Sequence, residues 1–260
     1  MKDLIIIKIG GQAISELTDD FFEQLAVWRT QGKKILLLHG GGPLITKLCQ
    51  QLQVPVVKKA GVRVTDAQAL ALTKLVLLGQ AQPLLLQKLS DHQLPVVGLN
   101  AADNQMLVGK YLDQSVYGEV GTVVSVNQDK LLPLLDSYIG VLAPLAMTPA
   151  GNWLNVNADQ AAADVASLLG AKKLYLMTDV AGVLNQHHLI PHLTKLVSQK
   201  LVAEKIISSG MQPKIKAAFA ACTAGVEQVA ITNCLQNPGT IITKERFNEP
   251  FISNLYSFPI

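Results

Sequence analysis

Short runs of consecutive hydrophobic residues alternate along the chain with longer stretches in which hydrophobic residues recur at helical spacing. The first run, Leu4 to Ile9, is rich in β-branched residues and stops at two glycines, which is typical of a buried parallel strand. Because such strands alternate with helices over most of the chain, we predict an α/β fold with a mainly parallel open sheet and helices on both faces. The other strands are expected over residues 34–38, 95–99, 138–145, 173–177, 228–231 and 240–242.

Residues that favour helix starts precede most of the helical stretches. Thr18 or Asp19 can cap the first helix, and Thr65 or Asp66 can cap a long one, because these side chains accept hydrogen bonds from the first free N–H groups of a helix. Pro43 stands where another helix should begin, which is a position that proline prefers. The predicted helices cover about residues 19–30, 65–89, 159–170, 193–205 and 213–224, with a further one starting at 43.

Residues 101–126 have a different pattern from the rest of the chain. They form short alternating segments punctuated by Gly109, Gly118 and Gly121, and we expect hairpins there that serve as a lid or a rim. In a mainly parallel sheet, ligands bind beyond the carboxyl ends of the strands, so the loops at that edge are the places to search for chemistry. The tail from Glu245 to Ile260 has no clear period and receives no assignment.

Composition argues against several classes of protein. The chain has 260 residues, of which 49% are hydrophobic, and its net charge of +3 is scattered, with no basic stripe among aromatic residues that would indicate nucleic acid binding. Cys49, Cys222 and Cys234 are widely spaced, which indicates a reduced, cytoplasmic protein without a Cys/His metal site. The hydrophobic runs are strand-length and the first begins almost at Met1, so we expect neither a membrane span nor a signal peptide.

Lys8 interrupts the first hydrophobic strand near its carboxyl end. A buried ammonium group is costly unless it is paired with an anion, and Gly10 and Gly11, which follow, let backbone N–H groups approach a phosphate closely. The alternative is a lysine whose ammonium reaches solvent at the strand end before a tight turn. Both interpretations fit this segment when it is taken alone.

Three consecutive glycines, Gly40 to Gly42, stand between His39 and Pro43. Each glycine costs about 0.5–1 kcal/mol of folding free energy relative to alanine, and a plain turn does not need three of them. A backbone cradle for an anion at the start of a helix does need them, because several N–H groups then point at one ligand. The sequence around them fits neither a Walker-type phosphate loop nor the dinucleotide-binding fingerprint.

Two further segments carry polar side chains at element junctions. Arg63 lies in a loop before a capped helix and can grip a carboxylate with its planar fork, although a single loop arginine is more often just solvated. Asn155, Asn157 and Asp159 are spaced by two, so they share one side of an extended chain and could bind a polar ligand and orient lysines. Helix capping by Asn157 or Asp159 is the alternative, and it explains one of the three residues.

Lys214 falls in the first turn of the helix that Pro213 opens. A cation is unfavourable there, because the start of a helix carries partial positive charge, but a bound phosphate would reverse the argument. A solvated lysine is the alternative, and Lys216 is not on the same face of the helix. The loops at 179–183 and 208–213 form two further junctions of this kind.

Taken together, these segments resemble the acetylglutamate kinases of the amino-acid kinase superfamily, in order and spacing from residue 4 to about 242. The matching pieces are Ile7 to Gly11, His39 to Gly42, Gly61 to Thr65, Asn155 to Gln160, Thr178 to Val183 and Gly210 to Lys214. The glycine-rich pieces are shared with carbamate, aspartate, glutamate and UMP kinases. The pieces around Arg63 and Asn155 are more specific to acetylglutamate kinases.

The resemblance implies that the chain uses ATP to phosphorylate the γ-carboxylate of N-acetyl-L-glutamate in arginine biosynthesis, with Mg²⁺ carried on the ATP phosphates and no protein metal ligand. It implies that Lys8 and Lys214 stabilise the transferring phosphoryl group and that Asp159 holds both lysines. The acceptor would be bound by Gly41, Gly42, Arg63, Asn155 and Asn157, with Arg63 on the α-carboxylate.

By the same resemblance, the backbone of Gly10, Gly11 and Gly41 would bind the ATP phosphates or the transferring group. The nucleotide would be framed by Asp179, Val180, Ala181, Gly182, Val183, Leu184, Ile206, Ile207, Ser208, Ser209 and Gly210. Ser208 and Ser209 stand where such sequences often have glycine, so this loop departs from the pattern of the family.

The resemblance also implies two lobes on one sheet, with residues 1–170 binding the acceptor and forming a dimer, and residues 171–260 binding the nucleotide. A homodimer is the basic unit of these kinases, and their arginine-inhibited forms carry an extra N-terminal helix that links dimers into a hexamer. The residues before Leu4 are too few for one helical turn of 3.6 residues. We therefore expect a dimer that arginine does not inhibit.

Two other functions remain open from the sequence. An acetylaminoadipate kinase, or another amino-acid kinase that makes an acyl phosphate, is close to this one, because a one-methylene difference is worth only about 1–3 kcal/mol of binding free energy. A non-catalytic sensor of nucleotide or amino acid on the same fold would not need both Lys8 and Lys214, and both are present. The sequence offers no convincing catalytic base, and an acceptor carboxylate with a reference pKa of about 4.3 needs none.

Overall fold

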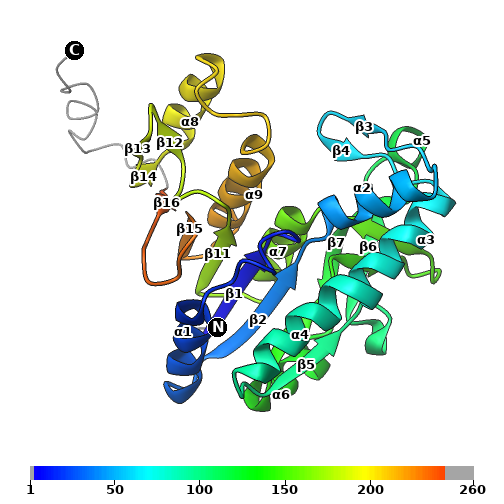
Figure 1. The fold of residues 1–260 in the computed structure, drawn as a ribbon, viewed down its shortest axis with the longest axis horizontal. Helices are drawn as coiled ribbons and strands as arrows, with labels where there is room; N and C mark the ends of the chain where they lie inside the picture. Colours follow the sequence, from blue (N-terminus) through cyan, green and yellow to red (C-terminus); the bar gives the residue numbers. More distant parts are fainter. Residues whose placement is uncertain (1–2, 244–260) are drawn as a thin grey trace.

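The computed structural model describes residues 3–243 of the chain, and an eight-stranded sheet forms its centre (Figure 1). Across the sheet the strands follow the order β14 (His192–Leu193), β16 (Thr240–Ile242), β15 (Gln228–Thr232), β11 (Lys173–Met177), β1 (Leu4–Ile9), β2 (Lys34–His39), β8 (Ile139–Leu142) and β5 (Val96–Leu99). Neighbouring strands are parallel except β15 with β16, so the predicted α/β fold with a mainly parallel sheet is confirmed.

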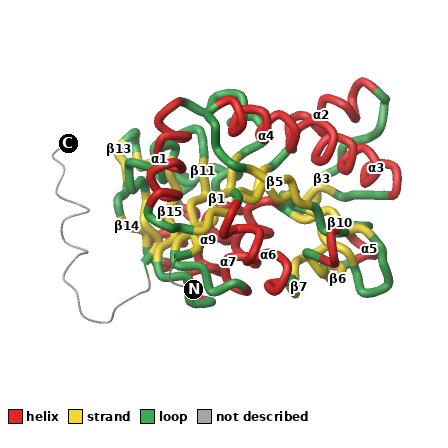
Figure 2. Tube along the Cα trace, turned by 90° about the horizontal axis from the view of Figure 1, so that it is seen from below, coloured by secondary structure: helices red, strands yellow, loops and turns green. Residues whose placement is uncertain are grey.

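Helices cover both faces of this sheet, as the alternation of strands and helices predicted (Figure 2). Successive side chains of a strand point to opposite faces, so in β1 Ile5, Ile7 and Ile9 join one hydrophobic core while Leu4 and Ile6 join the other. The first core includes residues of α1 (Asp19–Thr30) and α4 (Gln82–Asp91). The second includes residues of α2 (Gly42–Gln51), α6 (Gln128–Ser137), α7 (Ala158–Leu168), α8 (Lys195–Ala203) and α9 (Gln212–Thr223).

The long helix predicted over residues 65–89 is present but is not uniform. α3 (Ala67–Val76), capped by the Asp66 carboxylate, continues through a π-helical turn, η1 (Leu77–Ala81), into α4. A π turn holds an extra residue, so it rotates the buried stripe of the helix. This 25-residue helix, Ala67–Asp91, is long and apolar enough to cross a membrane by length and composition alone, a test that core helices also pass, and 50% of its most apolar window is buried inside the fold.

Residues 101–126 contain the predicted hairpin, but its strands close into a small barrel instead of standing free as a lid. The barrel strands follow the order β10 (Trp153–Val156), β7 (Val120–Val126), β6 (Leu107–Tyr111) and β9 (Leu145–Met147), and α5 (Gln114–Tyr117) lies between β6 and β7. A Cβ atom on Gly109 would stand 2.7 Å from the Cβ atom of Ala146, and one on Gly121 would stand 2.6 Å from Leu154. These glycines therefore allow the strands of a narrow barrel to approach.

Two other differences from the predicted elements have local causes. The strand expected over residues 138–145 is divided between β8 in the main sheet and β9 in the barrel, because Pro144 between them has no N–H to continue a ladder. Helix α6 was not among the predicted helices. It contains Pro133, a residue that usually breaks a helix, and the Asn127 side chain caps its start.

Further short elements are η2 (Asp103–Gln105) and two hairpins, β3 (Lys58–Lys59) with β4 (Val62–Arg63) and β12 (Leu184–Asn185) with β13 (His188–Leu189). The boundary expected between two lobes near residue 170 stays a prediction. The tail from Glu245 and the start of the chain at Met1 lie outside the described residues.

Candidate active site

A cleft of about 550 Å³ opens beyond the carboxyl ends of β1, β2 and β11, at the edge of the sheet where chemistry was expected. The glycine loops after β1 and β2 line it, together with parts of the β3–β4 hairpin, the barrel and the first turns of α7 and α9. The predicted site residues that it brings together are Lys8, Gly10, Gly11, Gly41, Gly42, Arg63, Asn155, Asn157, Asp159, Asp179 and Lys214.

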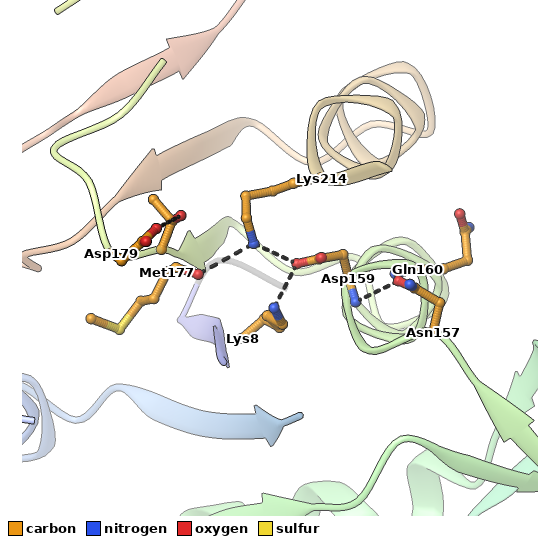
Figure 3. A network of polar contacts seen from close by, with 8 residues as sticks. Lys8, Asn157, Asp159, Gln160, Met177, Asp179 and Lys214 are labelled. Carbon is orange, nitrogen blue, oxygen red and sulfur yellow. Dashed lines mark hydrogen bonds and ion pairs between the residues drawn. The ribbon is translucent and has the colours of Figure 1, made fainter. Parts of the chain in front are cut away.

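Lys8 and Lys214 meet on a single carboxylate oxygen (Figure 3). The Nζ atom of Lys8 lies 3.0 Å from Oδ1 of Asp159, and the Nζ atom of Lys214 donates to the same oxygen at 2.9 Å. Lys214 also donates to the carbonyl of Met177 at 3.3 Å. Both lysines are buried, with 8% and 7% of their surface exposed, so neither is the solvated lysine that the sequence allowed as an alternative.

Burial and the charges of this cluster shift the pKa values of Lys214 and Asp159. The pKa of Lys214 is lowered to about 8, chiefly by burial and next by the neighbouring Lys8 charge, while Asp159 acts in the opposite direction. Burial by itself would raise the pKa of Asp159, but the two ammonium groups outweigh it and lower that pKa. Two cations on one anion leave a positive charge without a partner in this cluster, which favours binding of an anion in the cleft.

The two glycine loops pack backbone against backbone. A Cβ atom on Gly11 would stand 2.6 Å from the Cα atom of Gly41, and one on Gly41 would stand 2.8 Å from the side chain of Leu77. The Gly40 N–H donates to the Ile9 carbonyl at 2.8 Å, which ties the second loop to the end of β1. Within residues 3–243 the N–H groups of Gly41 and Gly42 have no protein acceptor, so they are free for a ligand.

His39 is fully buried at the end of β2, immediately before the second glycine loop. Burial lowers its pKa to about 4, against a smaller opposing effect of the Gly40 carbonyl, so the imidazole is neutral near pH 7. Its Nδ1 atom lies 3.3 Å from the Gly40 carbonyl oxygen, and its Nε2 atom has no hydrogen-bond partner in the part of the chain that is described.

Arg63 stands on the β3–β4 hairpin at another wall of the cleft. One of its terminal nitrogens donates to the Thr46 hydroxyl at 2.7 Å and to the Gly42 carbonyl at 3.2 Å. No carboxylate among the described residues pairs with it, so its charge is available to a ligand. Asn155, from barrel strand β10, donates to the Thr65 hydroxyl at 3.0 Å and thereby reaches the start of α3.

Asn157 and Asp159 have separate tasks at the start of α7. The side-chain oxygen of Asn157 accepts from the N–H groups of Asp159 at 3.0 Å and Gln160 at 3.1 Å, so it caps the helix as the alternative interpretation had it. Because Asn157 caps the helix, the Asp159 carboxylate is not needed as a cap and pairs with the two lysines. Asn157 also lines the cleft, so its cap bonds do not remove it from the site.

Most of the residues predicted to frame the nucleotide do not line this cleft. Val183 is buried and donates its N–H to the Thr240 hydroxyl at 2.8 Å, and a Cβ atom on Gly182 would stand 2.6 Å from the same side chain. These two residues therefore have structural contacts, and a role toward nucleotide stays a prediction. The predicted residues outside the cleft lining are Val180, Ala181, Gly182, Val183, Leu184, Ile206, Ile207, Ser208, Ser209 and Gly210.

Sequence reasoning missed several residues that line the cleft. Gln12 and Glu16 lie in the loop after β1, and Lys58 pairs with Arg63 in the hairpin register. Lys58 and Arg63 are close in the sequence, and this spacing could have indicated that Lys58 lies beside Arg63 at the wall of the cleft. Leu77 carries no such signal, because its place depends on how a π-helical turn packs against a distant loop.

Within residues 3–243 no three His, Cys, Asp or Glu side chains gather to hold a metal ion. The carboxylates that line the cleft belong to Glu16, Asp159 and Asp179.

Comparisons with known proteins agree with the fold and indicate the family. The model of the amino acid kinase family matches residues 3–233. An acetylglutamate kinase of Lactiplantibacillus plantarum is 53% identical over 245 residues, which cover 94% of this chain and 99% of that protein. An acetylglutamate kinase of Listeria welshimeri is 44% identical over 243 residues, covering 93% and 97%.

Among solved structures, the protein smu.665 of Streptococcus mutans UA159 superposes with a TM-score of 0.88 at 38% identity, over 94% of this chain and 99% of that one. Since the family model and these relatives each cover most of the chain, the chain belongs to the amino acid kinase family.

Proposed function

We propose that this chain is an acetylglutamate kinase, which transfers the γ-phosphoryl group of ATP to the γ-carboxylate of N-acetyl-L-glutamate in the arginine biosynthesis of the cytoplasm. The observation that carries the proposal is the cluster of Lys8, Lys214 and Asp159 at the floor of the cleft. Relatives that are 53% and 44% identical over nearly their whole length are acetylglutamate kinases, which supports the choice of acceptor.

The cluster suits transfer to a carboxylate. An acceptor carboxylate is ionised near pH 7 and needs no general base, so the reaction depends on positioning and on neutralising charge. The bond between the γ-phosphorus and the bridging oxygen of ATP breaks, a bond from the acceptor oxygen to phosphorus forms, and ADP leaves with the electron pair. Lys8 and Lys214 would stabilise the oxygens of the transferring group, and Asp159 would hold both ammonium groups in place.

The acceptor would lie between the lysine cluster and Arg63. Arg63 would bind the α-carboxylate, since it has charge to offer and no carboxylate partner among the described residues. Asn155, Asn157 and Gly42 would orient the remainder of the molecule at the cleft wall.

The nucleotide phosphates would bind at the glycine loops, with the N–H groups of Gly10, Gly11 and Gly41 as donors. The outer loops around Asp179 and Gly210 would frame the nucleoside. Mg²⁺, when bound through the phosphate oxygens, supplies further neutralisation of charge, and the cleft offers only scattered carboxylates toward it.

The experiment that tests this function is ADP release from Mg-ATP with single candidate acceptors: N-acetylglutamate, glutamate, aspartate, 2-acetylaminoadipate, carbamate and UMP. We expect kcat/KM to be highest for N-acetylglutamate, with 2-acetylaminoadipate lower by about 10-fold or more, as one methylene group allows. A preference for another acceptor, or no acceptor-dependent ADP at all, would contradict the proposal.

We further propose that the enzyme is a homodimer. Leu75 on α3 is 63% exposed and Leu84 on α4 is 40% exposed, so the long apolar helix presents hydrophobic side chains at the surface of a single chain. Light scattering of the purified chain measures the mass, and adding L-arginine to that measurement and to the activity assay tests the expected insensitivity to arginine. A monomer, or a mass that changes with arginine, would contradict the proposal.

A further inference from the structure

His39 is a buried imidazole to which the proposed chemistry assigns no task. It is 0% exposed at the end of β2, and by the alternation of the strand it lies on the same face as Ile35 and Leu37, in the core covered by α1 and α4. By the same alternation Lys8 on β1 points to the opposite face. His39 therefore does not point to the lysine cluster.

The imidazole has one hydrogen-bond contact among the described residues, the 3.3 Å contact from Nδ1 to the Gly40 carbonyl. A neutral ring carries one N–H, and placing it on Nδ1 lets it donate to that carbonyl. The opposite tautomer would set a bare nitrogen against the carbonyl and bury an unpaired N–H, so it is less stable. Even the better tautomer leaves Nε2 unpaired, and a leucine of similar size would avoid that cost.

The contact fixes the direction of the next peptide group. The Gly40 carbonyl and the Gly41 N–H belong to one planar trans peptide, so they point in opposite directions. The Gly40 N–H is itself held by the Ile9 carbonyl at 2.8 Å, which prevents the loop from turning as a unit. With the carbonyl held at the imidazole, the Gly41 N–H points away from the core, on the side where Gly41 lines the cleft and has no protein acceptor among residues 3–243.

We propose that His39 is a positioning residue, whose Nδ1–H holds the Gly40 carbonyl so that the Gly41 N–H is aimed at the transferring phosphoryl group. This inference rests on the proposed kinase function and adds a residue that acts through the backbone without touching a substrate. It also accounts for an imidazole in a place where a hydrophobic side chain would be more stable.

Three substitutions of His39 separate the effect of its hydrogen bond from the effect of the volume of the imidazole ring. His39→Asn places an amide nitrogen where Nδ1 stands, His39→Gln places one toward the Nε2 position, and His39→Leu has no donor. Removing one donor to a developing charge lowers kcat by about 10²–10³-fold, so misdirecting one should lower kcat by about 10-fold or more. We expect this loss in the leucine and glutamine variants, with KM for both substrates changed less than about 3-fold, and recovery of most of the rate in the asparagine variant.

A second measurement keeps the test independent of turnover. In the complex of the enzyme with Mg-ADP, aluminium fluoride and N-acetylglutamate, the aluminium fluoride imitates the transferring phosphoryl group. The affinity of the leucine and glutamine variants for this combination should fall by about the same factor as kcat, and their affinity for Mg-ADP alone should be unchanged. Ile35→Val, on the same face of the same strand, is the control: it should lower Tm without changing kcat.

The results have distinct meanings. A leucine or glutamine variant within about 2-fold of the wild-type kcat would overturn the proposal, and so would an asparagine variant as slow as the other two, since the ring would then only fill space. A wild-type protein that phosphorylates no acceptor would contradict the proposed function and with it this inference, whereas an active wild type whose His39→Leu variant keeps its kcat would contradict the role of His39 alone.

Discussion

Replacing Asp159 by asparagine should inactivate the enzyme through the lysines and in a way that depends on pH. The substitution removes the carboxylate whose Oδ1 atom lies 3.0 Å from Lys8 and 2.9 Å from Lys214. The amide oxygen that replaces it still accepts a hydrogen bond but carries no charge. The two ammonium groups would then face each other in a buried site without an anion between them.

The magnitude follows from the geometry. An ion pair at about 4 Å is worth about 4 kcal/mol at an effective dielectric constant of about 20, and one pKa unit corresponds to about 1.36 kcal/mol. The pKa of Lys214 is already lowered to about 8 with the carboxylate present. Losing about half of the pair interaction would lower it by a further one to two units, so that most of Lys214 is neutral near pH 7.5.

We expect kcat of the Asp159→Asn variant to fall by about 10²-fold or more near pH 7.5 and to recover in part toward pH 6, because the acceptor stays ionised there while Lys214 regains its proton. Release of ADP at saturating substrates over about pH 6–9 measures this. Asp164→Asn is the control, since Asp164 lies on the same helix but bonds to Thr122 and Gln160 and does not line the cleft. A variant within about 5-fold of wild type near pH 7.5, or one whose kcat falls further toward pH 6, would refute the reasoning.

Three further predictions concern the same cleft. In the wild type, kcat/KM should fall as the pH rises through about 8, because the protonated form of Lys214 is the active one and its pKa is lowered to about 8; a flat profile to pH 9 would contradict this. Lys214→Met should lower kcat by about 10²-fold or more, whereas Tm should stay equal or rise, because Lys8 and Asp159 remain as a one-to-one ion pair. Substitution of the exposed Lys216 by methionine should change neither kcat nor Tm. A large fall in Tm with Lys214→Met would contradict this by showing that the lysine stabilises the fold. Arg63→Lys should raise KM for N-acetylglutamate by about 10-fold with KM for ATP nearly unchanged, because the bidentate fork is lost, and a selective rise in KM for ATP would place Arg63 at the nucleotide.

The sequence was most informative where a local pattern determines structure. The buried strand Leu4–Ile9, the glycine loop at Gly40 and the position of Lys214 in the first turn of α9 all follow from features within a few residues of each other. Because parallel strands present their carboxyl ends at one edge, the loops after them were expected to lie together there, and the family resemblance added Lys214 to the same site.

The parts that sequence could not predict depend on distant partners. The barrel requires β10 to pair in parallel with β7 and antiparallel with β9, and no local period encodes those two neighbours. The π-helical turn places Leu77 so that a Cβ atom on Gly41 would stand 2.8 Å from its side chain, and no local pattern encodes this contact. Helix α6 was not predicted, and it holds Pro133, a residue that usually breaks a helix, in its interior. The Gly182 loop packs against Thr240, so a resemblance in its sequence did not place it at the cleft lining.

The central claim is that paired lysines on one carboxylate direct phosphoryl transfer to a carboxylate acceptor. Its most direct test is to trap the acyl phosphate with hydroxylamine and to count acyl hydroxamate against ADP, in the wild type and in Lys214→Met. The account predicts one hydroxamate per ADP with N-acetylglutamate in the wild type, and loss of both products together in the variant. ADP formed without hydroxamate, or hydroxamate formed by the variant at the wild-type rate, would contradict it.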